Sequence, residues 1–185
     1  MVVKLIEEIN KCLDIDCYLT ALISALSLPD ICGKAEYPTD KPAERYKKWY
    51  EEYIGKYEAD DITRENNIPY PSGEVVYSLR NSLVHAGSPD INETTCDIQE
   101  FDLLMQSKDT FNIYVGSAGV KTDGYGNVTR SLCINIRQLC YKLCVCAEHY
   151  YKNNKDKFGF INSKLTYWSP QARQFLKRKR EDFES

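Results

Sequence analysis

The chain has 185 residues, of which 43% are hydrophobic and 28% charged, and this is the composition of an ordinary globular protein rather than a disordered one. That length is most simply a single domain that buries about two-thirds of its unfolded surface. The formal net charge of −3 argues against an indiscriminate coat of positive charge for nucleic acid. A local basic patch remains compatible with it, because electrostatic steering depends on how charge is distributed.

The N-terminal stretch, MVVKLIEEINKCL, is interrupted by Glu7, Glu8 and Lys11 and lacks the apolar core of a signal peptide. No run of the sequence approaches the roughly 20 apolar residues that span a bilayer. The eight cysteines are therefore expected to be reduced and buried rather than bridged. The sequence predicts a cytoplasmic protein that makes no membrane contact.

Residues 2–13 carry apolar side chains at helical spacing, which predicts an amphipathic first helix. The stretch from Tyr18 to Leu28 is apolar nearly all round, which predicts a second helix buried at the centre of a bundle. Asp16 is the expected cap of this helix, and Pro29 is its expected stop.

Residues 29–42, PDICGKAEYPTDKP, are rich in turn-forming residues and predict a connecting loop. Within this loop Asp30 is expected to make a turn or to cap a helix. A third helix is predicted to begin with Asp40 as its cap and Pro42 in its first turn, and to run through ERYKKWYEEYI. Residues 58–72, acidic and then proline-rich, predict another loop.

A fourth helix is predicted from about Gly73 to Ala86, with Ser72 as its cap and Gly87 as its C-terminal stop. On a helical wheel the apolar stripe of this helix consists of Val76, Leu79 and Leu83.

Beyond Gly87 the hydrophobic pattern becomes that of strands. Residues 111–115 predict one strand, TDGYGN predicts a turn, and the alternating residues of VTRSLCINI predict a second strand. Asn135 is then the expected cap of a long helix that runs through Tyr151. A short helix and the basic stretch KRKRED are predicted to end the chain.

These elements predict a single, mainly α domain over residues 1–185, a helical bundle with a small β-hairpin insertion. The helical core is expected over about 1–87 and 135–152, and the hairpin over about 111–134. Residues 171–185 form a basic C-terminal tail. The sequence shows neither an internal repeat nor a boundary between domains.

The end of the fourth helix, LRNSLVHAG, brings a cation, an amide and an imidazole into one short stretch at Arg80, Asn81 and His85. An imidazole moves protons near neutral pH, which attack by a ribose 2′-hydroxyl requires. A guanidinium pairs with a phosphate and stabilises the charge that develops during transfer. Asn81 would orient His85 or bind a phosphate oxygen. The stretch holds no carboxylate cluster of the metal-ligand type, so the predicted chemistry is metal-free RNA cleavage.

The same residues have a purely structural interpretation. On a regular helix Arg80 and His85 lie about 140° apart, so their spacing alone does not bring them together. A cation near a helix C-terminus interacts favourably with the last carbonyls, and His85 before Gly87 fits that role. Arg80 would then lay its stem on the core and bond a tyrosine or a carboxylate.

The segment YSLRNSLVHAG resembles the Arg-x4-His signature of HEPN domains, in which a polar residue often follows the arginine. Upstream, ALISALSLPDICGKAEYP followed by ERYKKWYEEYI resembles an uncharacterised prokaryotic HEPN-like group. The resemblance covers residues 18–87, and the rest of the chain only as a hairpin followed by a helix. A hairpin at 111–134 departs from a minimal HEPN bundle.

That resemblance implies a HEPN-like helical bundle, homodimerisation and, in active members, metal-independent ribonuclease activity in toxin–antitoxin or antiphage systems. Carried onto this chain, the catalytic residues would be Arg80 and His85, with Asn81 assisting. No cofactor and no metal are expected. RNA, a second copy of the chain and an antitoxin or other protein are the expected partners. The alternative is a non-catalytic HEPN-like module that binds a nucleotide or a protein.

Two further clusters have alternative interpretations. Cys133, Cys140, Cys144 and Cys146 lack paired Cys-x2-Cys spacing, so buried small side chains are expected there rather than a zinc site. The aromatic side chains of the third helix would form core or a dimer interface, or else stack bases. These aromatic residues are Tyr46, Trp49, Tyr50 and Tyr53.

The basic run from Lys177 to Arg180 is predicted to be a solvated chain end, and the alternative is a contact with an RNA backbone. The sequence contains no phosphate-cradling glycine-rich loop, no Gly-x-Ser-x-Gly and no His-Glu-x2-His motif. It therefore gives no support to a nucleotide triphosphatase or to a serine or zinc hydrolase.

Overall fold

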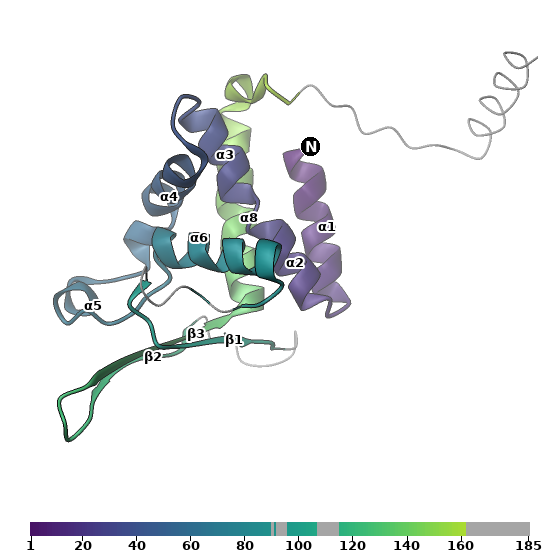
Figure 1. Ribbon diagram of the computed structural model, residues 1–185. Coiled ribbons are helices and arrows are strands. Elements are labelled where there is room, and N and C mark those ends of the chain that lie inside the picture. Colours follow the sequence, from purple (N-terminus) through teal and green to yellow (C-terminus); the bar gives the residue numbers. More distant parts are fainter. Residues whose placement is uncertain (90, 92–95, 107–114, 162–185) are drawn as a thin grey trace, which may run out of the picture.

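The computed structural model describes residues 1–89, 91, 96–106 and 115–161 (Figure 1). Its helices are α1 (Val2–Asp14), α2 (Tyr18–Ala25), α3 (Leu28–Glu36), α4 (Pro42–Tyr53), α5 (Asp61–Glu65), α6 (Gly73–Asn81) and α8 (Ile136–Asn153). Shorter helical turns are η1 (Gly55–Tyr57), η2 (Ser82–Ala86) and η3 (Lys155–Phe158), and the strands are β1 (Glu100–Leu104), β2 (Val115–Thr122) and β3 (Val128–Asn135). The chain is mainly α, as the sequence predicts.

Helix α8 runs through the middle of the bundle, where α1, α2 and α3 pack against it (Figure 1). Its buried stripe includes Leu139, Leu143 and Ala147, none of which is exposed to solvent. Burying a leucine side chain contributes about 1.5–3 kcal/mol, so this stripe holds the N-terminal helices to the C-terminal half of the core. Within the described ranges, no helix combines the length and the apolar composition needed to cross a bilayer.

The predicted loop over residues 29–42 is wrong for its first part, because residues 28–36 form helix α3. Pro29 lies in the first turn of α3, where its missing N–H costs no helical hydrogen bond. It therefore begins a helix, and the prediction that it stops the second helix is wrong because α2 already ends at Ala25. Asp30 neither makes a turn nor caps a helix: its carboxylate pairs with Arg45 of α4, with Oδ1 and Nη2 2.9 Å apart.

Helices α3 and α4 approach closely at Gly33. A Cβ atom at this position would lie 2.6 Å from the backbone oxygen of Arg45, which is too short for a real contact. The glycine of the PDICG stretch is therefore a packing requirement between two helices.

Two of the four predicted helix caps are wrong. Asp40 does not cap α4, which follows Lys41, and instead its Oδ2 lies 2.6 Å from Nζ of Lys48. Asp16 does not cap α2 either: it has a left-handed φ of 58° and accepts hydrogen bonds from Tyr18 and Arg137. In both cases the carboxylate forms an ion pair with a basic side chain and does not accept a hydrogen bond from the start of the helix.

The other two predicted caps are confirmed. Ser72 accepts a hydrogen bond from the backbone N–H of Val75 at the start of α6, and Asn135 accepts one from Gln138 at the start of α8. The loop predicted over 58–72 contains a helix that was missed, the five-residue α5, which is capped by Asp60. So short a helix has no apolar periodicity from which to predict it.

A three-stranded sheet lies along one side of the bundle, with strand order β1-β3-β2 (Figure 1). Strands β2 and β3 pair antiparallel as the predicted hairpin, whose turn is held by Asp123 accepting backbone hydrogen bonds from Tyr125 and Asn127. Strand β1, parallel to β3, was not predicted. The strand predicted over 111–115 lies outside the described residues except for Val115, where β2 begins. The predicted C-terminal helix and basic tail, 171–185, also lie outside them.

The carboxylate of Glu36 joins α3 to the end of α8. It accepts hydrogen bonds from Tyr150 and from Lys157, whose Nζ is 2.7 Å away. The hydrogen bond from Lys157, followed by that from Tyr150, lowers the pKa of Glu36 below its ordinary value. Because the folded pKa is depressed, this contribution to stability is present above the unfolded pKa of Glu36 and is lost as the pH falls through the folded value.

We predict that Glu36→Gln lowers the free energy of unfolding at pH 7 by about 1–2 kcal/mol, since it removes a charged hydrogen-bond acceptor. The loss should shrink as the pH falls through the lowered folded pKa of Glu36, where the native carboxyl is itself being protonated. Thermal denaturation across this pH range measures both effects. Glu8→Gln, at an exposed position of α1, is the control, and equal behaviour of the two variants would contradict the prediction.

Candidate functional site

Helix α6 has one face in the core and one face open to solvent. The predicted stripe is confirmed, because Val76 and Leu79 are fully buried and Leu83 is 7% exposed. On the open side, α6 and η2 line a groove of about 630 Å³. The groove includes Glu74, Tyr77, Arg80, Asn81 and His85.

Arg80 and His85 line the same groove because the end of the helix is not a regular α-helix. Residues Ser82–Ala86 form the π-helical turn η2. In an α-helix, residues five apart point about 140° away from each other. A π turn closes its hydrogen bonds after five residues instead of four, so residues five apart come close to the same side. Arg80 itself lies in α6, just before this turn, and the wider turn reduces the angular separation that the sequence spacing presents.

The side chain of Asn81 accepts a hydrogen bond from the side chain of Arg80. The Nη1 atom of Arg80 donates to Oδ1 of Asn81 over 2.9 Å, and both side chains are half-buried. The amide therefore orients the guanidinium group, whereas the sequence had suggested that it would orient the imidazole or bind phosphate. The structural interpretation of Arg80 also changes, since this arginine bonds an amide rather than a tyrosine or a carboxylate.

The rest of the groove is nearly neutral. Glu74 pairs with Lys47 of α4, with 2.8 Å between Oε2 and Nζ, and the same ammonium lies over the ring of Tyr77. Tyr46 lies beneath this region, where burial raises its pKa and the positive charge of Arg80 offsets part of that rise. Among the described residues that line the groove, the positive charge without a carboxylate partner therefore lies at the end that holds Arg80.

His85 is exposed on η2, two residues before the chain turns away. Gly87 has a φ of 67°, which confirms it as the left-handed stop of the helix. An exposed imidazole is accessible to a substrate, and it also lies where a cation would interact with the last carbonyls. The position of His85 is thus compatible with both interpretations of the sequence.

The aromatic side chains of α4 are core residues. Tyr46, Trp49 and Tyr50 are at most 1% exposed, and Trp49 packs edge-on against Tyr150 of α8. They are inaccessible to nucleobases and to a second subunit, so the base-stacking and dimer-interface alternatives are wrong for these three residues. Tyr53 is half-buried and stacks on Trp49.

The described cysteines are free thiols, and their exposure to solvent differs from one to the next. Cys140 and Cys144 are buried as predicted, and burial raises the pKa of Cys144 to about 12. The prediction that the cysteines are buried is wrong for Cys17, which is exposed, and for Cys12, Cys96, Cys133 and Cys146, which are half-buried. Among the residues that the structure describes, no group of three or more histidine, cysteine or acidic side chains has the arrangement of a metal site.

The sequence did not single out Glu74 or Tyr77 as parts of this groove. Both lie on α6 upstream of the motif, with Tyr77 about one helical turn and Glu74 about two helical turns before Arg80. Their helical spacing to Asn81 would have placed them on its face, but only the packing of α4 shows which face is open. No protein-family model, no curated protein and no solved structure matches this chain.

We predict that Gly87→Ala lowers the free energy of unfolding by about 1 kcal/mol, because a Cβ atom strains the left-handed backbone. Nothing lies within 4 Å of the added carbon, so crowding makes no contribution. Gly87→Asn should cost less, since asparagine tolerates this conformation. Gly124→Ala in the hairpin turn is the control, and denaturant unfolding is the measurement. Equal losses for alanine and asparagine at position 87 would contradict the explanation.

Proposed function

We propose that this protein is a metal-independent endoribonuclease of the HEPN type, with Arg80 and His85 as its catalytic residues and Asn81 assisting. The observation that supports this proposal most is that Arg80 and His85 line one open groove although they are five residues apart, with His85 on the π turn η2. The order of the sequence blocks upstream of the motif supports it as well.

In the proposed reaction, His85 takes the proton from a ribose 2′-hydroxyl. The 2′ oxygen then bonds to the adjacent phosphorus while the bond from phosphorus to the 5′ oxygen breaks. The departing 5′ oxygen takes a proton from solvent, so the products are a 2′,3′-cyclic phosphate and a 5′-hydroxyl. Arg80 binds the non-bridging oxygens, whose negative charge grows as the new bond forms.

Asn81 is a positioning residue in this scheme. Its hydrogen bond to Nη1 fixes one end of the guanidinium and leaves the other terminal nitrogen, Nη2, to be directed at a phosphate oxygen. The proposal also includes a homodimer and a toxin–antitoxin or antiphage role, with an antitoxin or another protein as regulator. A cytoplasmic location is part of the same proposal, since RNA is the substrate.

The first test is cleavage of end-labelled single-stranded and structured RNA in the presence of EDTA. We predict cleavage by the native protein and a loss of about 10²–10⁴-fold in rate for His85→Ala, which removes the general base. His149→Ala is a matched control, because His149 is the second histidine of the chain and is exposed on α8. Intact RNA with all three proteins, or equal cleavage by all three, would refute the proposal.

A second candidate function is a non-catalytic HEPN-like module that binds a nucleotide or a protein in the same groove. The hydrogen bond from Arg80 to Asn81 favours it, because the guanidinium is already engaged in the free chain.

Arg80→Ala distinguishes the two candidates. If the protein is a ribonuclease, we expect the cleavage rate to fall by about 10²–10³-fold, with weaker effects on binding. If it is a binding module, the variant changes ligand affinity and neither protein turns RNA over. Asn81→Ala should have a smaller effect than Arg80→Ala in either case, because Asn81 acts through the guanidinium. A larger effect of Asn81→Ala would contradict its positioning role.

A further inference from the structure

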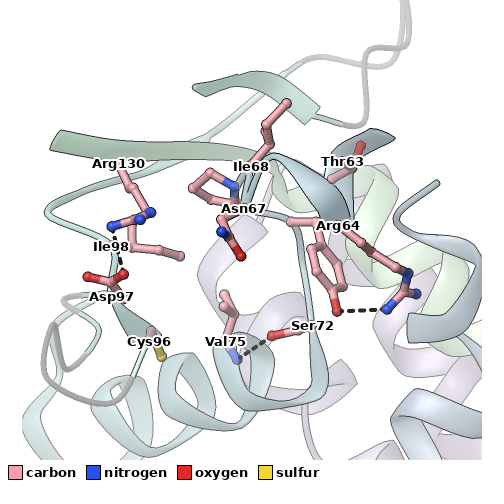
Figure 2. Close-up of a pocket in the computed structure, with 12 residues that line it drawn as sticks. Thr63, Arg64, Asn67, Ile68, Ser72, Val75, Cys96, Asp97, Ile98 and Arg130 are labelled. Carbon is pink, nitrogen blue, oxygen red and sulfur yellow. Dashed lines mark hydrogen bonds and ion pairs between the residues drawn. The ribbon is translucent and has the colours of Figure 1, made fainter. Parts of the chain in front are cut away.

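A second cavity, of about 610 Å³, lies beside the N-terminal half of α6. Three separate parts of the chain form it: the segment from α5 to α6, residues 96–98, and Arg130 of β3. Figure 2 shows Arg130 and Asp97 on one side of the cavity and Arg64 on the other, with Asn67 between them. Its volume is in the range of cavities that hold small ligands.

The two arginines give this second cavity a net positive charge. Arg130 is held by Asp97, with 2.7 Å between Nη1 and Oδ2, and its backbone N–H donates to the side chain of Gln99. Because this ion pair uses Nη1, the second terminal nitrogen of the guanidinium points its hydrogens elsewhere. Arg64 is exposed, and its hydrogen bonds within the described part of the chain are long, 3.3 Å to the hydroxyl of Tyr70 and 3.5 Å to the carbonyl of Lys56. It can be redirected to an anion at little cost.

The start of α6 does not supply the anion-binding groups. The N–H of Gly73 donates to the carboxylate of Glu51, and the N–H of Val75 donates to Ser72. These two amides are therefore satisfied inside the chain, and the guanidinium groups are the positively charged donors that line the cavity.

The walls of the cavity between the arginines are apolar and aromatic. Ile68, Pro69, Val75 and Ile98 line it together with Tyr70, whose ring lies 5.3 Å from the guanidinium carbon of Arg64. An aromatic ring with an adjacent guanidinium binds the flat face of a nucleobase by stacking and its phosphate by charge. The amide of Asn67 adds a donor and an acceptor for the edge of a base. This combination fits a nucleotide better than a simple anion or a purely apolar ligand.

This cavity and the catalytic groove share α6 as a common wall. Ser72 and Val75 face the cavity, whereas Glu74 and Ser78 face the groove. Cys96 lines the cavity, and its Sγ atom lies 3.9 Å from the backbone oxygen of Glu74. From Ser72 to Arg80 the helix rises about 12 Å, a distance that a few nucleotides of one strand cover.

We propose that the second cavity binds a nucleotide of the single-stranded RNA that is cleaved in the groove, and thereby positions the strand along α6. This inference rests on the proposed function for the identity of the ligand. It assigns Arg64 and Arg130 to the phosphate, and Tyr70 and Asn67 to the base. The subsite would hold the strand a few nucleotides from the bond that is broken.

The test is the affinity of a fluorescently labelled single-stranded oligoribonucleotide, measured by anisotropy with the full chain carrying His85→Ala so that the RNA stays intact. In that background, Tyr70→Leu is expected to weaken binding by about 5- to 100-fold, the range for loss of one base stacked on an aromatic ring. Tyr70→Phe should restore most of the affinity because it keeps the ring. Arg64→Gln should weaken binding and reduce the dependence on salt by about one counterion.

Lys11→Gln is the matched control for the loss of charge, because Lys11 is exposed on α1, which lies at the opposite side of the bundle from α5 (Figure 1). Native-like melting curves of the Arg64 and Tyr70 variants exclude unfolding as the cause of weaker binding. Unchanged affinity in both Arg64→Gln and Tyr70→Leu would overturn the inference. Competition by a nucleoside monophosphate that is as strong as competition by the unlabelled oligonucleotide would also overturn it, since the ligand would then be a free nucleotide.

Cleavage by the protein with native His85 separates this inference from the proposed function. RNA cleavage that is unaffected by Arg64→Gln and Tyr70→Leu would leave the catalytic groove intact and remove the subsite. Oligonucleotide binding that depends on both residues, in a protein that never cleaves RNA, would support the cavity and refute the ribonuclease. Loss of both binding and cleavage in Tyr70→Leu, with recovery in Tyr70→Phe, supports the two together.

Discussion

The burial of one face of α6 is the constraint on which the candidate site depends. Val76 and Leu79 are fully enclosed, and the ring of Tyr77 packs edge-on against Tyr46 of α4. Once Val76 and Leu79 are buried, the opposite face of the helix has to point to solvent. Arg80 and Asn81 therefore have a fixed orientation without being part of the core themselves. A helix that rolled by one residue would expose an apolar side chain and bury a charge, and both changes are costly.

The position of α6 in turn depends on the aromatic core beneath it. Trp49, Tyr53 and Tyr150 pack against one another and join α4 to α8, and Glu36 accepts a hydrogen bond from Tyr150 on the same side. Helices α1, α2 and α3 also pack against α8. Residues far apart in the sequence therefore fix a single position for α4. The groove and the second cavity both lie on α6, so the geometry of both sites depends on this packing.

The two sites have different chemistry although they share one helix. The groove carries a guanidinium and an imidazole, which are groups for charge stabilisation and proton transfer. The second cavity carries two guanidinium groups, an aromatic ring and apolar walls, which are groups for binding. An arrangement in which one end of a helix reacts and the other end holds the same strand would let binding energy orient the bond to be broken.

The sequence by itself determined the features that depend on local chemistry. The apolar stripes of α1, α6 and α8, the caps at Ser72 and Asn135, the stop at Gly87 and the turn of the hairpin were all predicted, because each follows from side chains within a few residues. It also singled out Arg80, Asn81 and His85 as the candidate catalytic residues.

Only the tertiary structure decided the features that depend on distant partners. Asp16 was predicted as a cap, but its carboxylate pairs with Arg137 of α8, far away in the sequence. Strand β1 forms by pairing parallel to β3, which lies about 30 residues later in the sequence. Arg64 and Arg130 line one cavity only after the chain has folded. The π turn that brings Arg80 and His85 into one groove likewise has no signal in the spacing of residues. A π turn is a rare local widening of a helix, and only the folded structure shows where it occurs.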